Sequence, residues 1–149
     1  MDDGMRRMFL RAREAAAVLS GSDTDCRNRA LAKMADALED GAAEILSANE
    51  ADMTAAAASL SPVMLDRLRL DEARIHGMAE GIRALISLPD PIGVTEEENV
   101  RPNGLRIRRV SVPLGVVAMI YESRPNVTAD AAALCLKSGN ACIDRKSVV

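Results

Sequence analysis

Hydrophobic residues recur at helical spacing through the first ninety positions of the chain. Such stripes, with charged residues on the opposite face, are typical of amphipathic helices. We predict helices over residues 5–19, 31–46, 49–58, 64–68 and 75–86. Together these helices make residues 1–94 the helical part of the chain.

The ends of these helices carry capping residues. The run from Ser22 to Asp25 supplies caps for the second helix, Asp71 precedes a further apolar stripe, and Ser61 is followed by a proline at the first helical position. Side chains of these types accept hydrogen bonds from the free N–H groups of a first turn. Gly41 interrupts the longest stripe and is expected to kink it.

The pattern changes after the proline-rich break at residues 89–93. Residues 95–103 are acidic and polar, which predicts an exposed loop. Residues 104–112 alternate apolar with basic side chains, so they indicate a half-exposed strand. A charged strand of this kind lies at a sheet edge or pairs with another subunit.

An apolar run over residues 114–121 predicts a strand that is covered on both faces. A polar turn follows at residues 122–126, where Pro125 disfavours a helical Arg124. Thr128 is expected to cap a buried helix over residues 129–137.

Gly139 is expected to end that helix, and residues 141–143 begin another strand. This strand–helix–strand order predicts an α/β fold in which residues 95–143 hold an edge strand and the first βαβ unit of a parallel sheet. Ligands of open α/β sheets bind at the carboxyl ends of the strands. No Gly-x-Gly-x-x-Gly occurs, so the motif count alone gives little support for a dinucleotide site.

Composition narrows the class of protein. The chain has 149 residues, 48% hydrophobic and 28% charged, which excludes a disordered protein. Its net charge of −3 gives no electrostatic attraction to nucleic acid. The charged amino terminus is unlike a secretory signal and no apolar run is long enough for a membrane span. Three cysteines without a close pair indicate a reduced, cytoplasmic protein.

Several segments resemble the gamma-glutamyl phosphate reductases, also called glutamate-5-semialdehyde dehydrogenases, of the aldehyde dehydrogenase superfamily. The resemblance lies in residues 64–68, 77–81, 88–93, 112–116, 121–128 and 134–141. It implies that these residues belong to the N-terminal cofactor-binding domain, with helices followed by the start of a Rossmann-like parallel sheet.

The resemblance also implies an activity. Family members reduce L-glutamyl 5-phosphate with NADPH to L-glutamate 5-semialdehyde and phosphate, the second step of proline synthesis from glutamate. The chemistry requires a cysteine thiolate, donors for an oxyanion, and a nicotinamide that delivers hydride. A homo-oligomer and an association with glutamate kinase are further expectations.

Asn126 matches the superfamily asparagine whose side-chain amide points at the oxyanion. From the residues alone, an asparagine at this place is more often a turn residue or a helix cap. The two roles are compatible, and the resemblance favours the catalytic one.

Ser123, Arg124 and Pro125 match the stretch along the nicotinamide half of the cofactor. Arg124 has alternatives: its planar fork suits a substrate carboxylate or phosphate, and it could pair with Glu122 or remain a surface charge. Arg145 matches a basic residue near the cofactor ribose, although the residues around it differ from the family.

No cysteine or histidine of the chain matches a catalytic group. Cys135 and Cys142 fall on the buried helix and the strand after it, and are expected to be small core residues. His76 is expected at the surface. No metal site is predicted.

The match to the family stops after Ile143. Family members are far longer, and their nucleophilic cysteine lies beyond this point. Residues 144–149 match the amino acids that a widely used sequencing adapter encodes in one reading frame. We therefore predict that they are a non-native tail on a truncated gene. Asp144 places a charge in a central strand, which is costly unless paired. Ordinary coding DNA beyond codon 143 would refute the tail.

Two other functions remain open. A non-catalytic helical module could use the stripes of residues 5–86 to dock a partner, although such stripes are more often core. An aldehyde-oxidising enzyme is disfavoured, because such members carry an aromatic residue before this asparagine. A truncated reductase is expected to be inactive alone.

Overall fold

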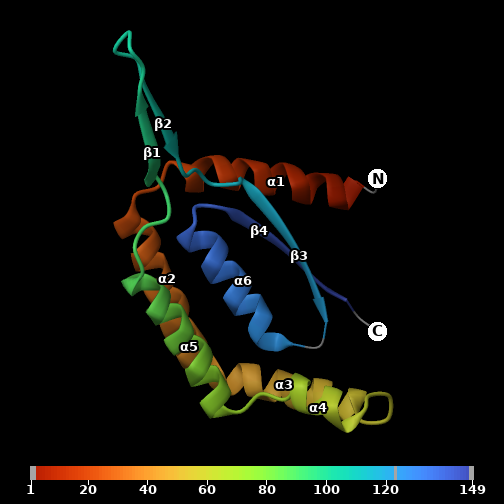
Figure 1. Cartoon of the computed structure of the whole chain (residues 1–149). Coiled ribbons are helices and arrows are strands. Elements are labelled where there is room, and N and C mark those ends of the chain that lie inside the picture. The colour runs from red at the N-terminus through yellow and green to blue at the C-terminus, as the bar shows by residue number, and fades with distance from the viewer. Residues whose placement is uncertain (1–2, 123, 148–149) are drawn as a thin grey trace.

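The computed structural model describes residues 3–122 and 124–147, and the side chains of residues 122 and 145–147 fall outside that description. The chain order, which can be followed in Figure 1, is α1 (Asp3–Ser20), α2 (Thr24–Asp40), α3 (Ala42–Ala56), α4 (Pro62–Leu68), α5 (Glu72–Ser87), β1 (Thr95–Val100), β2 (Arg106–Val110), β3 (Val116–Glu122), α6 (Pro125–Lys137) and β4 (Ala141–Ser147). The predicted α/β class is confirmed.

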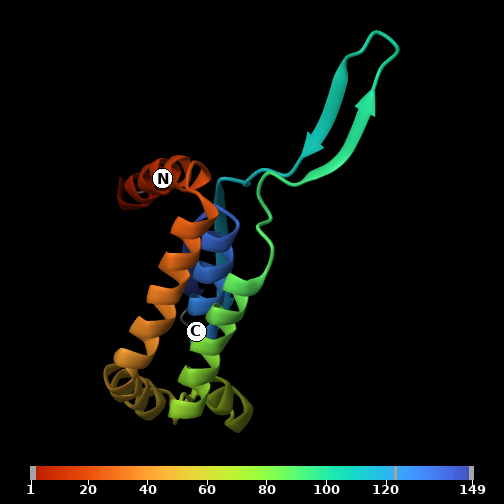
Figure 2. The ribbon, with the colours of Figure 1, turned by 90° about the vertical axis from the view of Figure 1, so that its left-hand side faces the viewer.

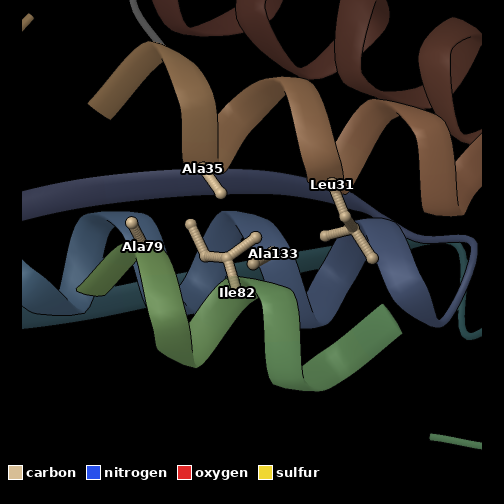
Figure 3. Packing of buried hydrophobic residues seen from close by; sticks show 5 residues of the cluster. All are labelled: Leu31, Ala35, Ala79, Ile82 and Ala133. Atoms are coloured by element: carbon tan, nitrogen blue, oxygen red, sulfur yellow. The ribbon is translucent and has the colours of Figure 1, made fainter. Parts of the chain in front are cut away.

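The core lies where α2, α5 and α6 meet. Helices α2 and α5 run side by side in opposite directions, and α6 packs against both (Figures 1 and 2). Leu31 and Ala35 of α2, Ala79 and Ile82 of α5, and Ala133 of α6 are fully buried and point into one interior (Figure 3). The alanines let the helix axes approach closely, which suits a core without aromatic residues.

The predicted caps are present. Asp23, Ser61 and Asp71 each accept a hydrogen bond from the backbone N–H three residues later, at 2.6, 3.4 and 2.7 Å. Gly41, where a kink was predicted, separates α2 from α3. Short-range capping chemistry therefore sets the start of these helices.

The predicted Thr128 cap is wrong, because α6 begins at Pro125. Proline has no N–H to satisfy and a backbone angle suited to the first helical position. Arg124 before it is extended, with φ −136° and ψ 95°, as the proline requires. Thr128 instead lies inside the helix, and its hydroxyl contacts that of Tyr121.

Strands β3 and β4 form the predicted parallel pair, joined through α6. Their register runs from Val116 opposite Ala141 to Glu122 opposite Ser147. The residues from Asp144 to Ser147, predicted to be non-native, thus continue the strand. Their origin stays a prediction that only the DNA can test.

Gly139 closes α6 where three segments meet. Its φ is +69°, and a Cβ there would lie 2.6 Å from Ile92 Cδ1 and 3.1 Å from Pro113 Cγ. Both the left-handed backbone and this close approach require glycine. The contact fixes the turn between α6 and β4 against the segments on either side of the β1–β2 hairpin.

We expect Gly139→Ala to destabilise the chain more than Gly93→Ala. Gly93 is a matched control, because its φ is +77° and a Cβ added there would meet no atom within 4 Å. Both variants carry the left-handed cost of about 1–2 kcal/mol, and only Gly139→Ala adds overpacking of about 1–3 kcal/mol. Urea unfolding measures the difference, and equal losses would show that the close approach is unimportant.

One face of β3 is uncovered, which contradicts the prediction of a strand buried on both faces, whereas Ala141 and Ile143 of β4 on the same face are 6% and 8% exposed. Val116 and Ile120 on β3 are 37% and 80% exposed, and Leu114 before the strand is 86% exposed. Helix α6 packs against the pair, and the described residues place no element over these side chains. The apolar run was interpreted correctly as a strand. Its pattern does not show, however, which face of the strand is covered by other segments of the same chain.

Residues 95–110 form an antiparallel hairpin, not the predicted loop and sheet edge. β1 and β2 pair only with each other, and the hairpin projects away from the helices (Figure 2). Glu98 accepts hydrogen bonds from Arg106 at 3.1 Å and Arg108 at 2.9 Å. These cross-strand pairs explain why a run of glutamates forms a strand.

Helix α1 packs beside β3 and β4 along part of its length (Figure 1). Of its apolar stripe Ala16 is buried, whereas Met5, Met8 and Phe9 are 38–43% exposed. In the described part of the chain, no helix combines the length and apolar character needed to cross a membrane.

Candidate active site

The turn between β3 and α6 opens onto a cavity of about 460 Å³. Its walls come from the end of α4, the connection to α5, the first turns of α5 and the beginning of α6. This places the cavity at the carboxyl end of a parallel strand, where α/β folds bind ligands. The position agrees with the one predicted from the strand–turn–helix order.

Asn126 lies at this opening as the second residue of α6. Its side chain is half-buried and borders the cavity. The amide Nδ2 donates to Asp130 Oδ2 at 3.2 Å, across one turn of the same helix. Because an amide nitrogen carries two hydrogens, one donor stays available to a ligand. Asn126 does not act as the N-cap, a position that Arg124 holds without a side-chain bond.

The other predicted site residues are placed unequally. Arg124 is exposed and Pro125 half-buried, and both border the cavity beside Asn126. Ser123 lies outside the described residues. Arg145 pairs through its backbone with Ile120, and its side chain lies outside the described part. The roles of all these residues stay predictions.

Nothing in the sequence indicated that arginines of the α4–α5 region, opposite Asn126, would line the cavity. Arg67, Arg69 and Arg74 border the cavity from the α4–α5 region, more than fifty residues before Asn126. Their convergence is a tertiary feature that local patterning cannot reveal. Together with Arg124 they give the cavity a positive lining, which Asp66 and Asp130 only partly offset.

A hydroxyl pair connects the strands to α6 near this opening. Tyr121 donates to Asp144 Oδ2 at 3.0 Å and contacts the Thr128 hydroxyl. Burial raises the pKa of Tyr121, so the phenol stays protonated and keeps its donor at neutral pH. Asp144 is exposed and hydrogen-bonded, and so avoids the cost predicted for a charge in a central strand.

The cysteines lie away from Asn126. Cys26 is exposed on α2, Cys135 is buried in α6, and Cys142 is half-buried in β4. Burial raises the pKa of the Cys142 thiol to about 11, so it is protonated at neutral pH. None of the three borders the cavity around Asn126. His76 is exposed and hydrogen-bonds Glu39 at 2.8 Å, as expected of a surface residue.

A nicotinamide dinucleotide fits part of this region. The carboxyl ends of two adjacent parallel strands and the exposed guanidinium of Arg124 are features that such a cofactor uses. The turn from residue 122 to residue 125 has no glycine, so it lacks the tight phosphate-binding loop of the dinucleotide fingerprint.

Known proteins resemble this chain over most of its length. No family model matches it. The gamma-glutamyl phosphate reductase of Caldanaerobacter subterraneus subsp. tengcongensis is 54% identical over 136 residues, which is 91% of this chain and 33% of that protein. That of Moorella thermoacetica is 57% identical over 136 residues, covering 91% and 32%. That of Xylella fastidiosa M12 is 50% identical over 142 residues, covering 95% and 33%.

Solved structures agree. The gamma-glutamyl phosphate reductase of Thermotoga maritima superposes with a TM-score of 0.88 at 42% identity, covering 91% of this chain and 33% of that one. That of Saccharomyces cerevisiae gives 0.84 at 35% identity, covering 91% and 35%. The chain is homologous to part of the gamma-glutamyl phosphate reductases. It spans about one third of the length of these reductases.

The resemblance noted in the sequence is therefore confirmed at the level of the family, and the arrangement of helices and parallel strands is confirmed with it. The relatives themselves are named as reductases. The roles of individual residues and the identity of the cofactor stay predictions.

Proposed function

We propose that this chain forms the part of a gamma-glutamyl phosphate reductase that holds the reacting acyl group of L-glutamyl 5-phosphate. The complete enzyme would release phosphate and L-glutamate 5-semialdehyde, in proline synthesis in the cytoplasm. The observation that carries the proposal is Asn126, whose amide borders a cationic cavity at the end of β3. The names of relatives at 50–57% identity support the reaction.

Asn126 would act when a thiolate attacks the acyl carbon and the carbonyl oxygen becomes an oxyanion. One Nδ2 hydrogen is held by Asp130, and the second would donate to that oxygen. Attack forms the carbon–sulfur bond, and collapse of the oxyanion then breaks the carbon–oxygen bond to phosphate, which leaves a thioester. Because no cysteine of the chain borders the cavity, the thiolate would come from the two thirds of the reductase not matched here.

NADPH, when bound, would supply the hydride that reduces the acyl group. Arg124 would hold it beside the cavity, together with Ser123 and Pro125 as the resemblance implies; Arg145 would take part only if residues 144–149 are native. The paired strands β3 and β4 would hold the turn in place. Because Asn126 is only two residues after Arg124, the cofactor-binding residue and the oxyanion donor would lie close together.

The proposal is tested by comparing the chain alone with a full-length chimera. In the chimera, the matched 136 residues replace their counterparts in the Caldanaerobacter reductase. We expect NADPH oxidation with L-glutamyl 5-phosphate from the chimera and none from the chain alone. A folded but inactive chimera would contradict the function, and turnover by the chain alone would contradict an external nucleophile.

A helical interaction module remains the second candidate, favoured by the exposed Met5, Met8 and Phe9 of α1. A module without catalytic function predicts that the chimera folds without activity. The same assay therefore separates the two functions.

A further inference from the structure

The cavity beside Asn126 has more cationic groups than the fold itself uses. Arg74 is engaged: it donates to the backbone oxygens of Asp66 and Arg69, both at 2.6 Å, and to the Asp66 carboxylate at 3.1 Å. These bonds hold the connection between α4 and α5 in place. Arg74 and Asp66 thereby neutralise each other and act as structural groups.

Arg67, Arg69 and Arg124 are different. Their side chains are exposed, border the cavity, and have no hydrogen-bond or ion-pair partner among the residues that the structure describes. A guanidinium fork left open toward a cavity suits a carboxylate or a phosphate. Because Arg67 and Arg69 lie within the segment from residue 66 to residue 69 that Arg74 holds, their backbone is preorganised for such a ligand.

Asp130 supplies the opposite charge on the α6 wall. It is exposed and lies one helical turn after Asn126, whose amide it accepts at 3.2 Å. It has no cationic partner in the described part of the chain. An acyl oxygen held by Asn126 would therefore lie close to a carboxylate that is free to accept from an ammonium group.

We propose that this cavity recognises the amino-acid head of the substrate. Asp130 accepts from the α-ammonium, and Arg67 and Arg69 bind the α-carboxylate, while Asn126 holds the acyl oxygen. The inference rests on the function proposed above and adds what selects the substrate. An ammonium and a carboxylate on one carbon match the Asp130 carboxylate on α6 and the open guanidinium groups of Arg67 and Arg69 on the α4–α5 wall.

The test measures ligand binding to the full-length chimera by calorimetry, whether or not it turns over. L-glutamate carries both head groups, glutarate lacks the ammonium, and 4-aminobutyrate lacks the α-carboxylate. We expect L-glutamate to bind about tenfold or more tightly than either analogue, since hydrogen bonds to charged groups are strong.

Variants assign each charge. Asp130→Asn keeps an oxygen for the Asn126 amide, and it should weaken L-glutamate about tenfold and leave glutarate unchanged. Arg67→Gln and Arg69→Gln should weaken L-glutamate and glutarate and spare 4-aminobutyrate. Asp25→Asn on α2 and Arg101→Gln near the hairpin tip are matched controls, and should change nothing.

Equal affinities for the three ligands, no measurable binding, or an equal effect of Asp130→Asn on L-glutamate and glutarate would overturn this inference. NADPH oxidation by the same chimera separates it from the proposed function. Turnover without head-group selectivity would contradict only the inference about substrate recognition. Selectivity without turnover would contradict only the proposed reaction.

Discussion

Replacing Asn126 by alanine is expected to lower kcat of the chimera by about 10²–10³-fold, the usual loss when one oxyanion donor is removed. KM should change little, because the donor contributes mainly where charge develops on the oxygen. The size of the effect is that expected of a typical oxyanion donor; in the structure the amide is half-buried at the cavity and donates to Asp130 among the described residues. Steady-state NADPH oxidation measures it.

A turn or capping role for Asn126 predicts a different result. The side chain makes no capping bond, so its removal should leave thermal stability nearly unchanged. Asn126→Asp is the matched control, because it keeps the size of the side chain and removes both donor hydrogens. Equal activity in all three proteins, or a fall in Tm that accounts for the lost rate, would contradict the catalytic role.

Ile82→Ala is expected to lower the free energy of unfolding by about 2–5 kcal/mol, which is the range for removing a large aliphatic side chain from a packed core. Ile82 is 1% exposed and belongs to the cluster where α2, α5 and α6 meet (Figure 3). Its loss leaves a cavity that the neighbouring alanines are too small to fill. Urea unfolding of the chain measures the change.

Leu134→Ala is the matched control for that experiment. Leu134 is an aliphatic residue of comparable size on α6, but it is 54% exposed. We expect a loss well below that of Ile82→Ala, because less apolar area leaves water at this position. Similar losses for the two variants would mean that the three-helix contact is not the stabilising core.

Elements whose signals are local could be predicted from the sequence. The caps at Asp23, Ser61 and Asp71 act over three residues, and a proline at position 125 determines the backbone before it. The strand–helix–strand order followed from the length of the apolar runs. The same local chemistry misplaced the start of α6, because Thr128 and Pro125 both suit a helix amino terminus and proline prevailed.

Features that depend on distant partners could not be predicted. Lys137 is 5% exposed, and its Nζ donates to Asn28 Oδ1 at 3.0 Å and to the Ile86 oxygen at 3.3 Å. The strand β1 depends on arginines that follow it by several residues. The open face of β3 depends on which other segments cover it.

The candidate site divides in the same way. Asn126 and Arg124 were found from the turn that they occupy, with the family resemblance giving them roles. Arg67, Arg69 and Arg74 reach the cavity only because α5, which follows α4 closely, packs against α6. Asp130 accepts from the Asn126 amide one helical turn away, a contact that depends on the orientation of both side chains.

The central claim is that the Asn126 amide stabilises the oxyanion that forms on thiolate attack and collapses as phosphate leaves. Phosphate release by the chimera in a single turnover, followed by rapid quench with and without Asn126→Ala, tests it most directly. We expect the substitution to slow phosphate release by about a hundredfold or more. An unchanged rate of phosphate release, with only a later step slowed, would contradict it.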